Sequence, residues 1–191
     1  MLKPYFNINL IEAGLDEVGR GCLAGPVVAA AVILPKNFSH PLLNDSKQLN
    51  EKERKIVKKL IIEEAIDYSI SEISAEEIDK INILKASIKA MHLCIDKLKV
   101  KPEHLLVDGN RFYAYPLIPH TCIIKGDAKF QSIAAASILA KEYRDDLMKN
   151  MAKKYPGYAW EKNMGYPTKK HKEGIKKIGL SPLHRLSFKS N

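Results

Sequence analysis

Four acidic residues of this sequence each stand at the end of a short apolar segment. They are Asp16 and Glu17 after residues 10–15, Asp108 after residues 104–107, and Asp127 after residues 121–125. Because the carboxyl ends of parallel strands meet at one edge of an open α/β sheet, we expect these side chains to gather there. Carboxylates held close together repel one another unless cations separate them. Oxygen ligands with few histidines nearby favour Mg²⁺ or Mn²⁺ over zinc or copper.

Paired divalent ions of this kind are a standard device for in-line attack on a phosphodiester. The alternative is that an aspartate after a strand simply forms a turn, as Asp108 followed by Gly109 illustrates. For one acid the turn is the better interpretation. For four acids at successive strand ends the metal site is favoured.

The loop after Glu17 is dense in glycine. Gly19, Gly21 and Gly25 follow the spacing GxGxxxG, which is not the dinucleotide fingerprint GxGxxG, and a strand rather than a helix follows. The loop also lacks the closing Gly-Lys-Ser/Thr of a phosphate-binding P-loop. What the spacing offers is backbone N–H groups that approach a phosphate or a hydroxyl closely. The alternative is a tight hairpin with no ligand.

The net charge of +9 lies entirely in the last part of the chain. Residues 1–148 hold 20 basic and 20 acidic residues, whereas residues 149–191 hold 11 basic and 2 acidic ones. This segment also carries the aromatic residues Tyr155, Tyr158, Trp160 and Tyr166. Basic residues interleaved with aromatics are typical of surfaces that contact phosphates and sugars, so nucleic acid is the expected partner. A solubilising tail is the alternative, and a membrane surface is disfavoured because no apolar stripe accompanies the aromatics.

The remaining reactive residues predict little chemistry. No Ser-His-Asp or Cys-His arrangement is evident, and His92 and His120 fit structural roles. His171 and His184 lie in the basic segment, where they could contact substrate, and no proton transfer is assigned to them. The three cysteines lack CxxC spacing and indicate a reducing, cytoplasmic compartment. No apolar run reaches the 18 or more residues of a membrane span, so we expect no membrane partner.

Hydrophobic patterns predict elements in the order β-β-α-β-α-α-β-β-α, followed by helices. The strands are expected near residues 10–15, 27–34, 66–70, 104–107 and 121–125. Asn50 with Glu53, and Ser74 with Glu77, are predicted capping boxes, and Thr168 is expected to cap a helix that Gly179 closes. The first two strands suggest a hairpin, and the later ones, reached through helical crossovers, suggest parallel pairing. We therefore expect one α/β domain over residues 1–191, a mixed five-stranded sheet flanked by helices over about 1–150 and a basic helical extension over about 151–191.

Several motifs together resemble the opening and later signatures of the ribonuclease HII family, the type-2 ribonucleases H. They are residues 13–21, 23–28, 45–47 (Asp-Ser-Lys), 107–110 (Val-Asp-Gly-Asn), 125–129 (Lys-Gly-Asp-Ala-Lys), 134–141, Arg144-Asp145, 165–168 (Gly-Tyr-Pro-Thr) and His184-Arg185. They occur in family order and span nearly the whole chain. The absence of the N-terminal domain expected of type-3 relatives favours type 2.

The resemblance implies a ribonuclease-H-like fold and hydrolysis of RNA within RNA/DNA hybrids. It also implies incision on the 5′ side of a single ribonucleotide in duplex DNA, which leaves 3′-hydroxyl and 5′-phosphate ends in primer removal and ribonucleotide excision repair. Two divalent cations, Mn²⁺ or Mg²⁺, and a monomeric state are expected. The 2′-hydroxyl is the group that separates RNA from DNA, so this activity agrees with a loop suited to approaching a hydroxyl.

The same resemblance assigns roles by position. Asp16, Glu17, Asp108 and Asp127 correspond to the catalytic, metal-binding carboxylates. Gly19, Arg20 and Gly21 correspond to the loop that contacts the 2′-hydroxyl and the adjoining phosphate, Tyr166 to a ring that packs on the neighbouring sugar, and Lys47 to a phosphate contact.

Two positions depart from the family pattern. Cys22 stands where we expect proline, which predicts a less rigid loop, and Leu186 stands where we expect a basic residue. Two rival functions remain: a nuclease of the same fold with another substrate, such as a junction resolvase or transposase, and a non-catalytic binding protein. The Gly19-Arg20-Gly21 loop with Tyr166 argues against the first, and the intact carboxylate set against the second.

Overall fold

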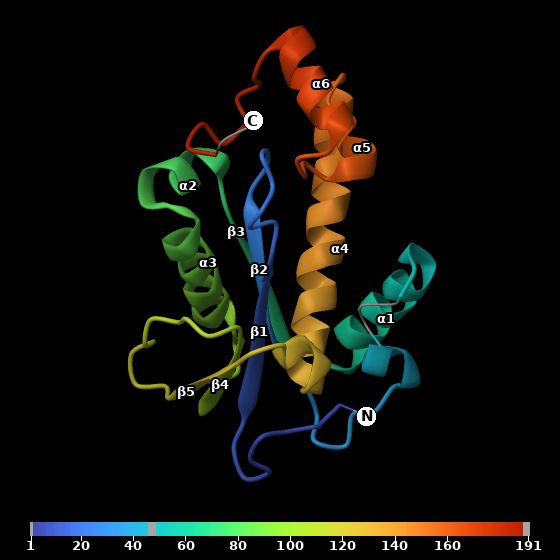
Figure 1. Ribbon diagram of the computed structural model, residues 1–191. Helices are drawn as coiled ribbons and strands as arrows, with labels where there is room; N and C mark the ends of the chain where they lie inside the picture. The colour runs from blue at the N-terminus through green and yellow to red at the C-terminus, as the bar shows by residue number, and fades with distance from the viewer. Residues whose placement is uncertain (1, 46–48, 189–191) are drawn as a thin grey trace.

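A five-stranded sheet forms the centre of the molecule in a computed structural model, which describes residues 2–45 and 49–188 (Figure 1). Its strands are β1 (Glu12–Val18), β2 (Val27–Ile33), β3 (Asp67–Ile73), β4 (His104–Asp108) and β5 (His120–Ile123). The helices are α1 (Glu51–Glu64), α2 (Ala75–Ile81), α3 (Ile83–Lys97), α4 (Gln131–Lys154), α5 (Trp160–Asn163) and α6 (Lys169–Ile178). Two 3₁₀ turns, η1 (Pro41–Asp45) and η2 (Gly126–Ala128), complete the described elements. The order of elements is the predicted one.

The strands lie in the order β3-β2-β1-β4-β5. As predicted, β1 and β2 form an antiparallel hairpin, and β4 runs parallel to β1 and to β5. The expectation of parallel pairing is wrong for β3, which runs antiparallel to β2. The chain leaves β2 at Ile33 and returns beside it, where the N–H of Ile66 donates to the Ile33 carbonyl at 2.9 Å. A connection that ends where it began gives an antiparallel pair even when it contains a helix.

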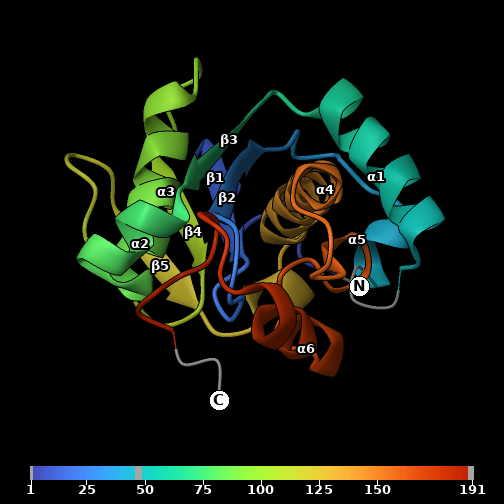
Figure 2. The same ribbon diagram turned by 90° about the horizontal axis from the view of Figure 1, so that it is seen from above.

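Helices cover both faces of the sheet, with α2 and α3 on one side and α4 on the other (Figure 2). Strand β2 serves both faces, because its seven apolar residues are all buried and alternate in direction. Val28 packs toward α4 and α1, and Ala29 toward α3. Helix α4 approaches β1 so closely that a Cβ on Gly14 would lie 2.2 Å from the carbonyl carbon of Ser132. The mixed, helix-flanked sheet expected from the sequence is confirmed.

The helix boundaries follow local chemistry. Asn50 and Glu53 form the predicted capping box of α1, and Thr168 and Gly179 bound α6 as expected. Ser74 caps α2, although only its own side chain takes part, accepting from the N–H of Glu77 at 3.2 Å. No helix among the described residues is long and apolar enough to span a bilayer.

The face of β3 that packs against α3 carries two short polar residues. Ile66 and Tyr68 are exposed, whereas Ser69, Ser71 and Ile73 are buried. The short serines leave room for α3, and the Ser69 hydroxyl donates to the Cys94 carbonyl at 2.7 Å. The other face of β3 also meets a core, because Ile70 packs against the cluster beside α4 and α1, whereas Tyr68 remains exposed.

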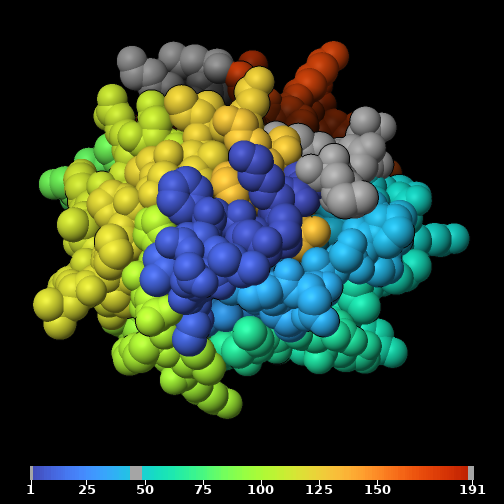
Figure 3. All heavy atoms as spheres, turned by 90° about the horizontal axis from the view of Figure 1, so that it is seen from below, coloured from blue at the N-terminus to red at the C-terminus, as the bar shows by residue number. Residues whose placement is uncertain are grey.

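The N-terminal segment covers the end of the sheet at which β1 begins (Figure 3). The N–H groups of Phe6 and Asn7 donate to the carboxylate of Glu12 at 2.9 and 2.6 Å. This acid at the start of β1 is therefore occupied by backbone donors. Asp16 and Glu17 lie near the other end of this strand.

Candidate active site

Strand β1 carries Asp16 and Glu17 inside it rather than after it, because the strand continues to Val18. The expectation of a strand ending at residue 15 is therefore wrong. Neighbouring residues of a strand point to opposite faces of a sheet. Asp16 faces α4, where the Ser137 hydroxyl bonds to it, and Glu17 faces the α3 side. The two acids thus straddle the sheet.

Asp16 and Asp108 lie on neighbouring parallel strands, because Leu15 pairs with Val107 in the register of β1 and β4. The Asp16 side chain is buried, and its Oδ1 accepts the N–H of Glu17 at 2.7 Å. Burial, followed by the charge of Glu17, raises the pKa of Asp16 well above its ordinary value, and Asp108 adds to the rise. This carboxyl is therefore placed where its negative charge is costly without a positive partner.

Asp108 is the last residue of β4 and receives a backbone donor from the turn after β5. Its Oδ1 accepts the N–H of Gly126 at 2.6 Å. Asp127, which is buried, is the next residue of that turn. Asp127 therefore directly follows the residue that donates to Asp108, although it lies in η2, four residues beyond the end of β5.

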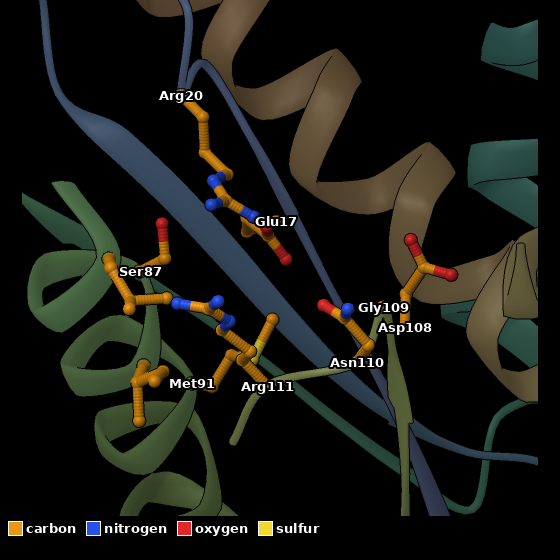
Figure 4. Close-up of a pocket in the computed structure, with 10 residues that line it drawn as sticks. Glu17, Arg20, Ser87, Met91, Asp108, Gly109, Asn110 and Arg111 are labelled. Atoms are coloured by element: carbon orange, nitrogen blue, oxygen red, sulfur yellow. Dashed lines mark hydrogen bonds and ion pairs between the residues drawn. The ribbon is translucent and has the colours of Figure 1, made fainter. Parts of the chain in front are cut away.

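Glu17 lines a cleft of about 50 Å³ at this edge of the sheet (Figure 4). Its Oε1 accepts from Nη1 of Arg20 at 3.0 Å. Burial raises the pKa of Glu17 while the Arg20 guanidinium opposes the rise, and Asp108 adds to it. The remaining lining residues are Leu84, Ser87, Ile88, Met91, Asp108, Gly109, Asn110 and Arg111.

Three polar residues of this cleft were not identified from the sequence. Asn110 and Arg111 directly follow the Asp108-Gly109 pair, and that adjacency was the signal that could have found them. Ser87 comes from α3, where no pattern distinguishes it from core residues. Its hydroxyl is buried and has no hydrogen-bond partner within residues 2–45 and 49–188. With Arg111 added to Arg20, the cleft contains two guanidinium groups beside the carboxylates of Glu17 and Asp108.

The glycine loop and the Tyr166 turn, far apart in sequence, lie in direct contact. The N–H of Leu23 donates to the Gly165 carbonyl at 2.8 Å, and a Cβ on Gly165 would lie 2.5 Å from the Ala24 carbonyl oxygen. Gly165 has a φ of +84°, so both its backbone conformation and this close approach require glycine. The Tyr166 side chain remains 42% exposed and available beside the loop.

The two departures from the family pattern occupy different environments. Cys22 is buried, and its Sγ lies 3.6 Å from the Met164 carbonyl, so it packs between the loop and the Tyr166 turn. Leu186 is exposed, and its N–H donates to Asp79 at 2.8 Å. Lys47, the expected phosphate contact, lies outside the described residues.

The expectation that the histidines of the basic segment contact substrate is wrong. His171 and His184 are buried, with their Nε2 atoms 3.1 Å apart, and His171 accepts from Nε1 of Trp160 at 2.9 Å. Tyr158 stacks on Trp160 at 4.8 Å between ring centroids. These aromatic and imidazole rings form a core that attaches the C-terminal segment to the end of α4. Only Tyr166 of the four expected aromatics is both exposed and next to the glycine loop.

The donor chemistry at this edge fits a hard divalent cation. All expected ligands are carboxylates, and Asp16 is buried beside two further acids that raise its pKa. A divalent cation relieves this repulsion, and hard oxygen donors suit Mg²⁺ or Mn²⁺. Within the described ranges, no three His, Cys, Asp or Glu side chains converge closely enough to form a complete ligand set.

Comparison with known proteins gives a consistent result over the whole chain. The model of the family Ribonuclease HII matches residues 13–191. A ribonuclease HII from Bacteroides thetaiotaomicron is 61% identical over 188 residues, which cover 98% of this chain and 94% of that protein. The structure of ribonuclease H2 from Pyrococcus horikoshii OT3 has a TM-score of 0.79 at 25% identity and 94% coverage of both chains. That of Bst-RNase HIII in complex with Mn²⁺ has a TM-score of 0.70 at 19% identity, over 94% of this chain and 67% of that one, and shares the fold.

Proposed function

Because the chain belongs to the ribonuclease HII family, whose members are endonucleases that hydrolyse RNA in RNA/DNA hybrids, we propose that it also incises duplex DNA at single ribonucleotides. The incision lies on the 5′ side of the ribonucleotide and leaves 3′-hydroxyl and 5′-phosphate ends. Such an activity serves primer removal and ribonucleotide excision repair in the cytoplasm. We expect the protein to act as a monomer.

The contact between the glycine loop and the Tyr166 turn carries this proposal. Cleavage at one ribonucleotide requires a group that recognises a 2′-hydroxyl and a second group that recognises the adjoining deoxyribose. Gly21 suits the first task, because a Cβ there would meet no atom within 4 Å and its φ is not in the left-handed region. Neither backbone strain nor packing requires glycine at this position. The missing side chain instead leaves room for the backbone to approach a ligand.

The proposed metal ligands are Asp16, Glu17, Asp108 and Asp127, which would hold two Mg²⁺ or Mn²⁺ ions. Ions held by these residues would supply an activated water and would stabilise the charge that develops on the leaving 3′ oxygen. The chain itself orients two of these carboxylates, through the Ser137 hydroxyl on Asp16 and the Gly126 N–H on Asp108. Arg20 and Arg111 at the cleft provide positive charge for the phosphates on either side of the cut.

The basic C-terminal segment extends the proposed substrate surface. Helix α6 exposes Lys169, Lys170, Lys176 and Lys177, and it begins just after Tyr166. Lysines on this helix suit contacts to the duplex backbone beyond the cleavage site, because they neutralise phosphates without reading sequence. Lys47 is proposed as a further phosphate contact.

The decisive experiment uses three duplexes of one sequence: a single ribonucleotide in DNA, a continuous RNA/DNA hybrid and all-DNA. We expect the first two to be cut in Mg²⁺ or Mn²⁺, the third to stay intact, and a chelator to abolish cleavage. End-labelled products should place the cut 5′ to the ribonucleotide, with a free 3′-hydroxyl that a polymerase extends. Cleavage of the hybrid alone, or a cut on the 3′ side, would contradict the proposal.

A further inference from the structure

Two arginines, Arg144 and Arg185, lie almost completely buried next to the glycine loop, with 0% and 2% of their surfaces exposed. A buried guanidinium is costly unless its donors are satisfied, and a carboxylate is its usual partner. Here each guanidinium instead donates three hydrogen bonds to main-chain carbonyls. Both arginines thus hold backbone in a defined orientation.

Arg185 places all three bonds on the glycine loop. Its Nη2 donates to the Gly19 carbonyl at 2.7 Å, its Nη1 to the Arg20 carbonyl at 2.9 Å and its Nε to the Gly25 carbonyl at 3.0 Å. The backbone of Arg185 is fixed as well, because its N–H donates to the Leu23 carbonyl at 2.8 Å. Burial lowers the pKa of Arg185 to about 10, so the side chain stays charged at neutral pH.

Arg144 divides its bonds between the loop and the Tyr166 turn. Its Nε and Nη2 donate to the carbonyls of Pro26 at 2.9 Å and Ala24 at 3.1 Å, and its Nη1 donates to that of Met164 at 2.8 Å. None of these three carbonyls belongs to the peptide units around Arg20. Two equally buried arginines with the same number of bonds therefore hold different parts of the site.

The bonds of Arg185 determine where two N–H groups point. In a planar trans peptide the N–H lies antiparallel to the carbonyl of the same unit. The Gly19 carbonyl shares its unit with the N–H of Arg20, and the Arg20 carbonyl shares its unit with the N–H of Gly21. Because both carbonyls point to Arg185, both N–H groups point away from it. No acceptor within residues 2–45 and 49–188 takes either N–H, and both residues are exposed.

We propose that Arg185 is a positioning residue that aims the N–H groups of Arg20 and Gly21 outward to receive a substrate oxygen. Two adjacent outward N–H groups form a donor pair suited to a hydroxyl oxygen or a phosphate oxygen. The Arg185 guanidinium holds the carbonyls of these peptide units, so the two N–H donors are oriented before substrate arrives. Binding then does not have to order the loop. This inference rests on the proposed function, since it assigns the ribonucleotide 2′-hydroxyl to that donor pair.

Arg185→Lys tests the inference because lysine keeps the charge but loses the planar fork that spans three carbonyls. Arg144→Lys is the matched control. It alters an equally buried arginine with the same number of hydrogen bonds, but Arg185 still holds the peptide units of Arg20 and Gly21. Values of kcat and KM are measured on the single-ribonucleotide duplex and on the hybrid, below the unfolding transition of each variant. The all-DNA duplex serves as a competitive inhibitor that reports binding without a 2′-hydroxyl.

For Arg185→Lys we expect kcat/KM on a cleaved duplex to fall by roughly ten-fold or more, the cost of misplacing one or two hydrogen bonds. Inhibition by all-DNA should change by less than about three-fold. On the continuous hybrid, where the Tyr166 contact matters less, Arg144→Lys should show a clearly smaller loss. Equal losses of the two variants on the hybrid, or unchanged kcat/KM in Arg185→Lys, would overturn the positioning role. Because the hybrid is tested too, a wild-type protein that fails on the single ribonucleotide refutes the proposed function and leaves the test of Arg185 in place.

A second measurement covers the case in which Arg185→Lys does not fold. In the wild-type protein with chelator present, the backbone amide signals of Arg20 and Gly21 are followed by NMR while each duplex is added. We expect both signals to shift with the single-ribonucleotide duplex and to shift less with all-DNA. Identical shifts with the two duplexes would show that these N–H groups do not receive the 2′-hydroxyl.

Discussion

The N–H of Leu23 donates to the carbonyl of Gly165 across 2.8 Å, and this bond joins the glycine loop to the turn that carries Tyr166. Arg144 strengthens the junction, since it holds the Ala24 carbonyl on one side and the Met164 carbonyl on the other. The proposed 2′-hydroxyl contact and the proposed sugar contact are therefore parts of one rigid unit. Under the proposed function, a substrate that fits one of these contacts and not the other should gain little binding energy from either, and a junction between RNA and DNA would be distinguished in this way.

Tyr166→Ala should lower incision at a single ribonucleotide by roughly ten- to hundred-fold, because stacking of a ring on a nucleotide contributes about 1–3 kcal/mol. Tyr166→Phe should lose much less, since the ring is kept, and continuous hybrids should suffer less than junctions. Both variants are assayed on both duplexes, with melting temperatures. Equal losses on the two duplexes together with a lower melting temperature would instead indicate that Tyr166 only packs the segment onto the domain.

Gly21→Ala and Gly19→Ala should separate substrate contact from folding. A Cβ on Gly21 meets open space, so the free energy of unfolding of this variant should lie within about 0.5 kcal/mol of the wild-type value. It should nevertheless lose activity, because the methyl group blocks the approach of substrate. Gly19 has a φ of +92°, and a Cβ there would lie 2.2 Å from Nε of Arg144, so its variant should lose about 1–2 kcal/mol or more. Urea unfolding and cleavage rates check both. Full activity in Gly21→Ala would show that the glycine loop does not contact substrate at this position.

Asp16→Asn and Asp108→Asn should abolish turnover and leave the fold intact. Asp16 is buried next to acids that raise its pKa, so neutralising it in the absence of metal should keep or raise the melting temperature. Rates in Mg²⁺ and thermal unfolding in chelator are the two measurements. Retention of more than about a tenth of the wild-type rate, a loss below ~1.4 kcal/mol, would refute the assignment of these residues as metal ligands.

Local chemistry in the sequence was sufficient to predict many elements but not their contacts. The unbroken apolar run of β2, the capping box at Asn50 and the cap at Thr168 are local signals, and the structure confirms them. The extension of β1 through two acids was not predictable, because acidic residues are poor strand formers and only pairing with β2 carries the strand on past Leu15. The sequence could therefore not reveal that Asp16 and Glu17 face opposite sides.

The C-terminal segment shows the same limit at longer range. Trp160 resembles a nucleic-acid contact when it is seen among lysines, yet it is fully buried against His171. Nothing within a few residues distinguishes it from the exposed Tyr166, because burial depends on α4 and on the return of the chain at His184. The donor pattern of Arg185 is equally non-local, since its acceptors lie more than 150 residues earlier.

Neutralising Lys169, Lys170 and Lys172 to glutamine should weaken the salt dependence of duplex binding. Each phosphate contact contributes a slope of about 0.9 log units of affinity per log unit of salt on B-form DNA, so up to about three contacts are lost. A matched triple variant uses Lys55, Lys59 and Lys80, each ion-paired with a glutamate four residues away, and should leave the slope unchanged. Equal slopes for both triple variants would mean that the charge of α6 only solubilises.

The buried His171–His184 pair should make the protein lose stability in mild acid. Burial, followed by the proximity of His171, lowers the pKa of His184 from 6.5 to about 4. Its Nδ1 accepts from the N–H of Ser181, and its ring meets the edge of Tyr158. A hydrogen bond with Ser181 opposes the shift in pKa but is the smallest of the three effects.

Between about pH 6.5 and pH 4, His184 is therefore protonated in the unfolded state and neutral in the folded state. The contribution of His184 is complete above pH 6.5 and is lost as the pH falls through this window, by up to about 3 kcal/mol. Trp160, the one tryptophan of the chain, contacts the pair, so its fluorescence during urea unfolding at pH 7.5 and pH 4.5 measures the loss. His184→Asn should unfold more easily at pH 7.5 but show a smaller difference between the two pH values. His92, whose ring bonds the Tyr113 carbonyl, lies away from this core, so His92→Asn should keep the wild-type difference in stability between the two pH values. A wild-type difference in His184→Asn would exclude His184 as its source.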